Sequence, residues 1–119
     1  MRLLIFLYIF LISTGTVVSA MEDLDLFQVA RNGNASMIRE VIASGTDLTV
    51  KDASGRNALM QSVLYGNQET ALALIENGID LETSDELGLT PLTLSVRYGD
   101  AEMTRILLEH GANVESKME

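Results

Sequence analysis

Residues 85–114 read DELGLTPLTLSVRYGDAEMTRILLEHGANV and contain the clearest signals for helix starts and ends in the chain. Thr90 can cap the free N–H groups at a helix start, and Pro91 is tolerated at the first helical position. Gly99 ends this short helix, and Asp100 can cap a second one. The second helix ends at the glycine of Glu-His-Gly, because glycine accepts the left-handed conformation that follows a helix C-terminus. The stretch therefore predicts two short helices, a tight turn between them and a loop after them.

The same pattern returns at a fixed spacing of 33 residues. The glycines at matching positions are Gly33, Gly66 and Gly99, and then Gly45, Gly78 and Gly111. Matching apolar positions include Leu26, Leu59 and Leu92. A repeat of this length indicates stacked copies of one small structural unit. The copies span about residues 21–51, 52–84 and 85–117, and they predict an all-α fold.

The third copy resembles the ankyrin repeat in several short motifs. They are Asp85-x-x-Gly88 ahead of Thr90-Pro91-Leu92, the turn Gly99-Asp100, and the segment ILLEHGANV at 106–114. A period of 33 residues is also the ankyrin period. The resemblance covers residues 22–117. It implies an ankyrin-repeat solenoid of about three helix-turn-helix repeats with short hairpin-like loops.

The copies depart from the ankyrin pattern at one position. The family usually has His after Thr-Pro-Leu, where it joins a hydrogen-bond network between repeats, but this chain has Phe27, Met60 and Thr93 there. We therefore expect weaker coupling between the repeats. Asn57 replaces the Thr of this motif in the second copy and can still cap its helix. Because each repeat contacts only its neighbours, three copies are close to the minimum for a stable stack, and we expect modest stability.

Residues 1–20 have the three-part layout of a secretory signal peptide. Arg2 is their only charge, Leu3 to Ile12 is an unbroken apolar run, and small residues precede a cut after Ala20. Cleavage there leaves residues 21–119 as the ankyrin-repeat domain. Two alternatives stay open: an uncleaved membrane anchor, and translation that starts after this segment and yields a cytoplasmic protein.

The chain is acidic and contains no cysteine, with a formal net charge of -9 at pH 7 and a pI of about 4.4. Because no basic patch is present to bind phosphates, we expect no nucleic-acid partner, and a membrane is expected to matter only for export. The absence of cysteine excludes disulfides and thiolate chemistry. An acidic surface suits a partner with a basic face, but it also keeps a small protein soluble, and both interpretations stay open.

A search for catalytic or metal-binding groups finds no constellation in the sequence. His110, the only histidine, stands at a predicted helix end, where a cation suits the helix dipole. It has no second histidine or cysteine to complete a metal site. Glu82, Asp85 and Glu86 share one loop but lack the ligand spacing of a calcium loop. We therefore predict no enzyme activity, no metal, no cofactor and no small-molecule substrate.

A protein partner is the expectation that the resemblance supports, since ankyrin-type stacks usually contact partners at their loop tips and at the exposed ends of their first helices. The candidate loop-tip residues are Lys51, Arg56, Glu86, Leu87 and Leu89. The candidate helix-end residues are Leu64, Tyr65, Arg97 and Tyr98, with Arg31 and Asn32 at the matching positions of the first copy. Tyr65 and Tyr98 should line up along the stack, and aromatic and Arg side chains are favoured interface anchors. The tyrosines alternatively shield neighbouring helices.

The far end of the third copy is a second candidate surface. Met103 and Ile106 are expected to face a fourth repeat that the chain does not contain. A terminal repeat normally presents a polar outer face. We therefore expect either a monomer or weak self-association through this end.

The sequence as a whole predicts an exported, periplasmic or secreted protein-binding module that serves one partner as an accessory or scaffold protein. One alternative is an inhibitor or immunity protein directed against a toxin or an enzyme, in which acidic residues such as Glu86 would speed the approach to a basic cleft. Another alternative is a membrane-anchored scaffold that keeps its N-terminal segment.

Overall fold

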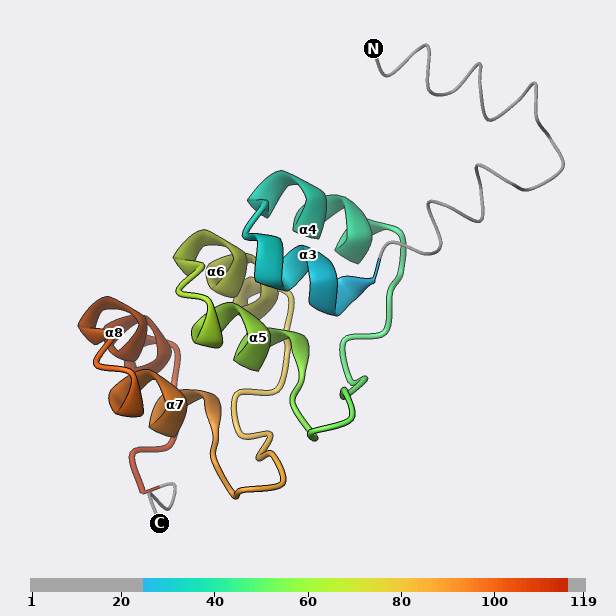
Figure 1. Cartoon of the computed structure of the whole chain (residues 1–119). Coiled ribbons are helices and arrows are strands. Elements are labelled where there is room, and N and C mark those ends of the chain that lie inside the picture. The colour runs from blue at the N-terminus through green and yellow to red at the C-terminus, as the bar shows by residue number, and fades with distance from the viewer. Residues whose placement is uncertain (1–24, 116–119) are drawn as a thin grey trace, which may run out of the picture.

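The computed structural model describes residues 25–115, and this range contains six helices and no strands. The helices are α3 (Leu26–Asn32), α4 (Ala35–Ala43), α5 (Ala58–Leu64), α6 (Gln68–Glu76), α7 (Pro91–Arg97) and α8 (Ala101–Glu109). They form three pairs, each joined by a tight turn, and the pairs stack side by side (Figure 1). The predicted all-α solenoid of three helix-turn-helix repeats is confirmed. The predicted signal peptide, residues 1–20, lies outside the described residues.

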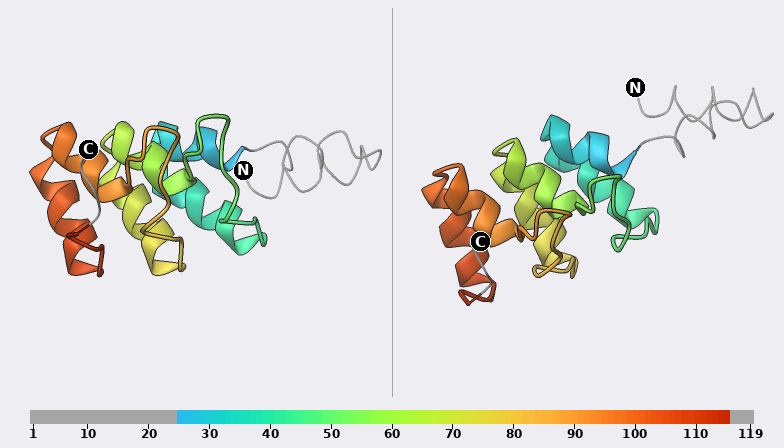
Figure 2. Two further views of the ribbon diagram at one scale, coloured as in Figure 1. Left: turned by 90° about the horizontal axis from the view of Figure 1, so that it is seen from below. Right: turned by 60° about the horizontal axis from the view of Figure 1, so that its bottom comes forward.

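The helices form two layers. The inner helices α3, α5 and α7 pack side by side, and the outer helices α4, α6 and α8 pack behind them (Figure 2). Long loops lead from each outer helix to the next inner helix, and both project from the same side of the stack (Figure 2). We call residues 51–57 and 84–90 of these loops the finger loops. The inner helices with the residues that cap them, together with the finger loops, make up the inner side of the molecule.

Caps at both ends fix the short inner helices. Thr90 accepts a hydrogen bond from the backbone N–H of Thr93, whose own hydroxyl accepts from the N–H of Thr90, and Pro91 follows as the first helical residue. In the second repeat, the side chain of Asn57 accepts from the N–H of Met60 at 3.0 Å. Gly99 has a φ of 68°, which allows the chain to leave α7 and enter α8 in a tight turn. These cap residues are the ones that the sequence indicated.

The hydrophobic core lies between the two layers and runs through all three repeats. The inner helices contribute Leu26, Leu59 and Leu92, and the outer helices contribute Val41, Leu74 and Leu107. Each set occupies matching positions of the 33-residue period, so the sequence repeat is the repeat of the core. Full burial of one such aliphatic side chain stabilises the fold by about 1.5–3 kcal/mol.

Two asparagines link parts of the chain that are distant in sequence. Asn57 Nδ2 donates to the carbonyl oxygen of Asp80 and to the hydroxyl of Thr83, both at 3.1 Å, which ties α5 to the loop that leads to the third repeat. Asn67 Nδ2 donates to the carbonyl oxygens of Ala30 and Arg31, at 2.7 and 2.8 Å, which ties the second repeat to the first. The bonds of Asn67 thus provide a polar link between two repeats in a chain that lacks the usual histidine.

Candidate protein-binding surface

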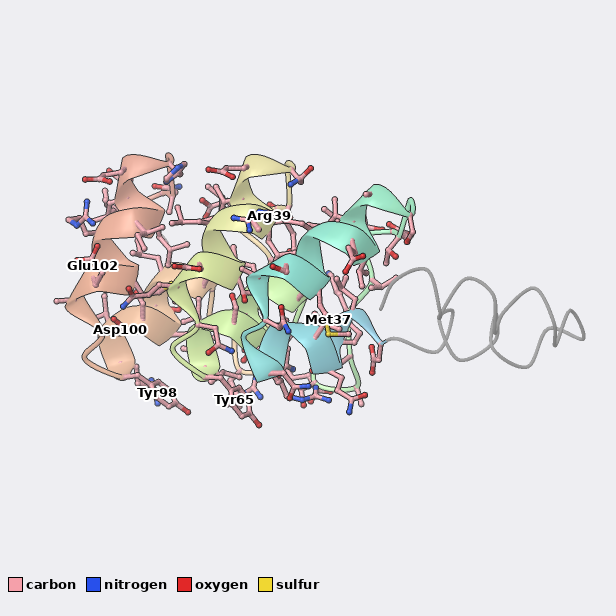
Figure 3. All side chains as sticks on the ribbon, turned by 90° about the horizontal axis from the view of Figure 1, so that it is seen from above. Met37, Arg39, Tyr65, Tyr98, Asp100 and Glu102 are labelled. Carbon is pink, nitrogen blue, oxygen red and sulfur yellow. The ribbon has the colours of Figure 1, made fainter. Side chains whose placement is uncertain are left out.

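The most exposed aromatic side chains of the described residues stand at matching places on two repeats. Tyr65 and Tyr98 directly follow α5 and α7, and they are 59% and 60% exposed. Figure 3 shows both side chains projecting in the same direction from one edge of the stack. The predicted alignment of the tyrosines is therefore correct. A ring that mainly covered a neighbouring helix would be largely buried, so this exposure favours contact with another molecule.

The tyrosines belong to a row of residues at the ends of the inner helices, which we call the helix-end strip. Its members are Arg31, Asn32, Leu64, Tyr65, Arg97 and Tyr98. Arg97 and Asn32 are exposed, whereas Leu64 is half-buried and packs against the hydrophobic core. Parallel helices pack about 8–10 Å apart, so matching residues of the strip follow one another at about that interval.

The finger loops place their predicted contact residues in different environments. Lys51, Glu86 and Leu87 are exposed, as expected of loop tips. The prediction for Leu89 is wrong, because this side chain is only 4% exposed and belongs to the hydrophobic core. Leu89 directly precedes the helix cap Thr90, and an apolar residue at that position typically packs onto the first turn of the helix.

Arg56 connects the two finger loops instead of pointing freely into solvent. Its Nε lies 3.2 Å from Asp85 Oδ2, and the Asp85 side chain is only 1% exposed. The other oxygen of Asp85 accepts the N–H groups of Leu87 and Leu89, both at 2.9 Å. A backbone bond from Glu86 N–H to the Ser54 carbonyl oxygen, at 3.0 Å, joins the same loops. The finger loops are thus held in one arrangement, and the sequence pattern gave no sign of this link.

Two carboxylates of the acidic loop, Asp85 and Glu82, accept hydrogen bonds from the backbone. The Asp85 carboxylate already accepts hydrogen bonds within the finger loops, and Glu82 accepts the backbone N–H of Asn113 at 2.8 Å. Within the described range, no group of three His, Asp or Glu side chains is arranged to hold a metal ion. His110 Nδ1 lies 2.8 Å from the carbonyl oxygen of Ile106, at the end of α8.

No helix between residues 25 and 115 is long and apolar enough to cross a membrane.

The charges of the described residues are divided between the two sides. On the inner side, acidic and basic groups balance: they are Asp25, Asp52, Asp85 and Glu86, against Arg31, Lys51, Arg56 and Arg97. The outer helices and the loops that follow them carry Glu40, Asp47, Glu69, Glu76, Asp80, Glu82, Glu102, Glu109 and Glu115, with only Arg39 and Arg105 against them, and Asp100 lies in the turn between α7 and α8. The excess negative charge of this range therefore lies on the outer side.

Ion pairing neutralises one of the two outer arginines. On the exposed face of α8, Arg105 hydrogen-bonds to Glu102 and, at 2.6 Å, to Glu109. The hydrogen bond from Arg105 holds the pKa of the Glu102 carboxyl below its ordinary value, because it favours the charged form. This charged row gives the last outer helix a polar surface.

The far end of the third repeat differs from its prediction. Met103 and Ile106 are buried, because both side chains lie on the face of α8 that packs inward. At this end of the stack Val96 is 43% exposed, whereas Val63 at the matching position of the second repeat is 2% exposed. The third repeat packs on Val63 but has no neighbour on its own far side within the described residues. Self-association through this end stays a prediction.

Comparison with known proteins agrees with this architecture. A family model described as ankyrin repeats in three copies matches residues 26–118, which is most of the chain. No curated protein matches it. Ankyrin repeats are protein-interaction modules. The three stacked helix pairs and the matched repeats show that the chain belongs to the ankyrin-repeat family.

Proposed function

We propose that this protein is exported and that it holds one protein partner on its inner side, as an accessory or scaffold protein. The observation that carries the proposal is the pair Tyr65 and Tyr98, which are exposed at matching positions of neighbouring repeats. Tyrosine is enriched at binding hot spots because it offers a large apolar surface together with a hydroxyl group.

The backbone behind the tyrosines supports this role. Each tyrosine is followed by a glycine with positive φ, Gly66 at 70° and Gly99 at 68°, and then by an outer helix. Most residues of the inner helices that precede them are buried. A side chain on such a fixed turn loses little conformational freedom on binding, and a smaller entropic cost leaves more of the contact energy as affinity.

Site-specific photo-crosslinking tests the proposed surface. A photoreactive amino acid would replace Tyr98 in the full chain produced in its native cells, and a matched variant would carry it at Glu109, which is exposed on the outer helix α8. We expect a single crosslinked partner from position 98 and none from position 109. The adduct should weaken when Tyr65→Ala is added. Adducts from position 109 alone would place the partner on the outer side and contradict the proposal.

Export is supported by the sequence layout of residues 1–20. N-terminal sequencing of the protein recovered from cells tests it, and a mature start at Met21 is the expected result. Recovery of the uncleaved chain in the membrane fraction would instead favour the anchored scaffold.

The inhibitor alternative has less electrostatic support. It needs negative charge on the surface that meets a basic cleft, but the excess negative charge of the described residues lies on the outer side. Glu86 is the only exposed carboxylate of the finger loops. We therefore favour the accessory or scaffold role.

A further inference from the structure

The helix-end strip carries positive charge in an otherwise acidic protein. Its only ionisable side chains besides the tyrosines are Arg31 and Arg97, and the carboxylate that lies beside it, Asp100, caps α8 by accepting the backbone N–H of Met103. Within residues 25–115, Arg56 is paired with Asp85 and Arg105 with two glutamates, whereas Arg31 and Arg97 make no ion pair.

The helix dipole explains only part of the placement of these two arginines. Arg31 and Arg97 stand in the last turns of α3 and α7, where a cation offsets the negative end of the helix dipole. That interaction acts at long range and leaves the N–H groups of the guanidinium open. A guanidinium with open donors binds a carboxylate through two parallel hydrogen bonds.

The order of residues along the strip sets the spacing of a complementary ligand. Arg31 and Arg97 belong to the first and third repeats, with Tyr65 between them and Tyr98 beside Arg97. At about 10 Å per repeat, the two arginines are about 20 Å apart. An extended peptide covers this distance in about six residues, at about 3.3 Å per residue.

From this geometry we infer that the partner presents an extended segment with two carboxylates about six residues apart and an apolar or aromatic residue between them. The carboxylates bind Arg31 and Arg97, and the central residue packs on Tyr65 and Tyr98. This inference rests on the proposed function, since it names the class of segment that the same surface takes. The outer side repels such a segment, because its carboxylates outnumber its arginines, so only the inner side accepts it.

Two synthetic peptides test the inference directly. Both have seven residues with phenylalanine in the middle, and one carries glutamate at both ends while the other carries lysine. We expect the glutamate peptide to shift the NMR signals of Tyr65 and Tyr98 in the full chain, with an affinity at least about tenfold higher than that of the lysine peptide. Its affinity should fall as salt is added. Equal binding of the two peptides, stronger binding of the lysine peptide or no binding by either would overturn the inference.

Charge-reversal variants separate this inference from the proposed function. Arg31→Glu/Arg97→Glu should reverse the peptide preference, and Arg31→Gln/Arg97→Gln should remove it. The control is Arg39→Glu, the same change at an exposed position of the outer helix α4, which should leave the preference intact. Circular dichroism would verify that each variant is folded.

If crosslinking from position 98 persists undiminished in the Arg31→Glu/Arg97→Glu variant, the inference of an acidic segment is wrong but the proposed protein-binding surface stands. If no partner is crosslinked from position 98 even when Arg31 and Arg97 are unchanged, the proposed function itself is wrong.

Discussion

A single polar side chain connects two neighbouring repeats through residues that are more than 30 positions apart in the chain. This side chain is that of Asn67, whose amide donates to two carbonyl oxygens of the first repeat, those of Ala30 and Arg31. The approach is so close that a Cβ atom on Gly33 would lie 2.6 Å from Asn67 Oδ1. Glycine at position 33 is therefore required for two reasons: its φ of 73° and the space that the asparagine occupies.

Replacing Asn67 by aspartate tests the value of this link. Asn67→Asp removes two hydrogen bonds and sets a carboxylate against two carbonyl oxygens, so we expect a loss of about 2–3 kcal/mol in the free energy of unfolding. Urea titration followed by circular dichroism measures it. Asn34→Asp is the matched control, because Asn34 uses its side-chain oxygen to cap α4 and aspartate caps equally well. Equal losses in the two variants would contradict this account.

A buried hydroxyl offers a route to higher stability. Thr70 is fully buried on α6, and its Oγ1 has no hydrogen-bond partner among the described residues. Thr70→Val keeps the shape and removes the unsatisfied oxygen, so we expect a gain of about 1 kcal/mol. For a domain of this size, that gain raises Tm by about 4–8 °C in calorimetry. A lower Tm would mean that the hydroxyl is satisfied by a partner, such as a buried water.

At the scale of whole elements, the finger loops depend on one ion pair. Arg56→Ala would leave the Asp85 carboxylate, which is 1% exposed, with its two backbone hydrogen bonds but no cation. We expect a loss of about 1–2 kcal/mol, which is below the cost for a fully buried pair because the Arg56 side chain is 26% exposed. A double-mutant cycle with Asp85→Asn measures the coupling. Additive effects of the two changes would show that the pair contributes nothing.

The sequence predicted the helices well and the loops less well, for physical reasons. The helices were predictable because caps such as Thr90 and turn glycines such as Gly99 act within a few residues. The burial of Leu89 was not, because it depends on packing against the hydrophobic core, whose other members come from distant parts of the chain. The hydrogen bonds of Asn57 and Asn67 to distant residues were equally unpredictable, since their partners lie 23 to 37 residues away.

The candidate site was predictable to a similar degree. The 33-residue period alone aligned Tyr65 with Tyr98, because identical units stacked in register bring matching residues into a row. The period could not show which face of α8 turns inward, since that depends on how the helix packs on α7. For this reason Met103 and Ile106 were predicted at the surface but are buried.

At the scale of the whole molecule, each repeat covers the one before it. Val63 and Val96 occupy the same position in consecutive repeats, but only Val63 is covered. We expect Val63→Ala to lower the free energy of unfolding by about 2 kcal/mol, and Val96→Ala to change it by less than about 0.5 kcal/mol. Chemical denaturation of both variants provides the comparison. A large loss from Val96→Ala would show that something covers this end in solution.

The uneven division of charge also makes the molecule an electric dipole. Near a positively charged surface, the outer helices turn toward the surface, because they carry the excess carboxylates of the described range. An amine-coated sensor or an anion-exchange bead would therefore immobilise the protein through its outer helices without any tag. Tyr65 and Tyr98, which project from one edge of the stack, would then remain open to the solution.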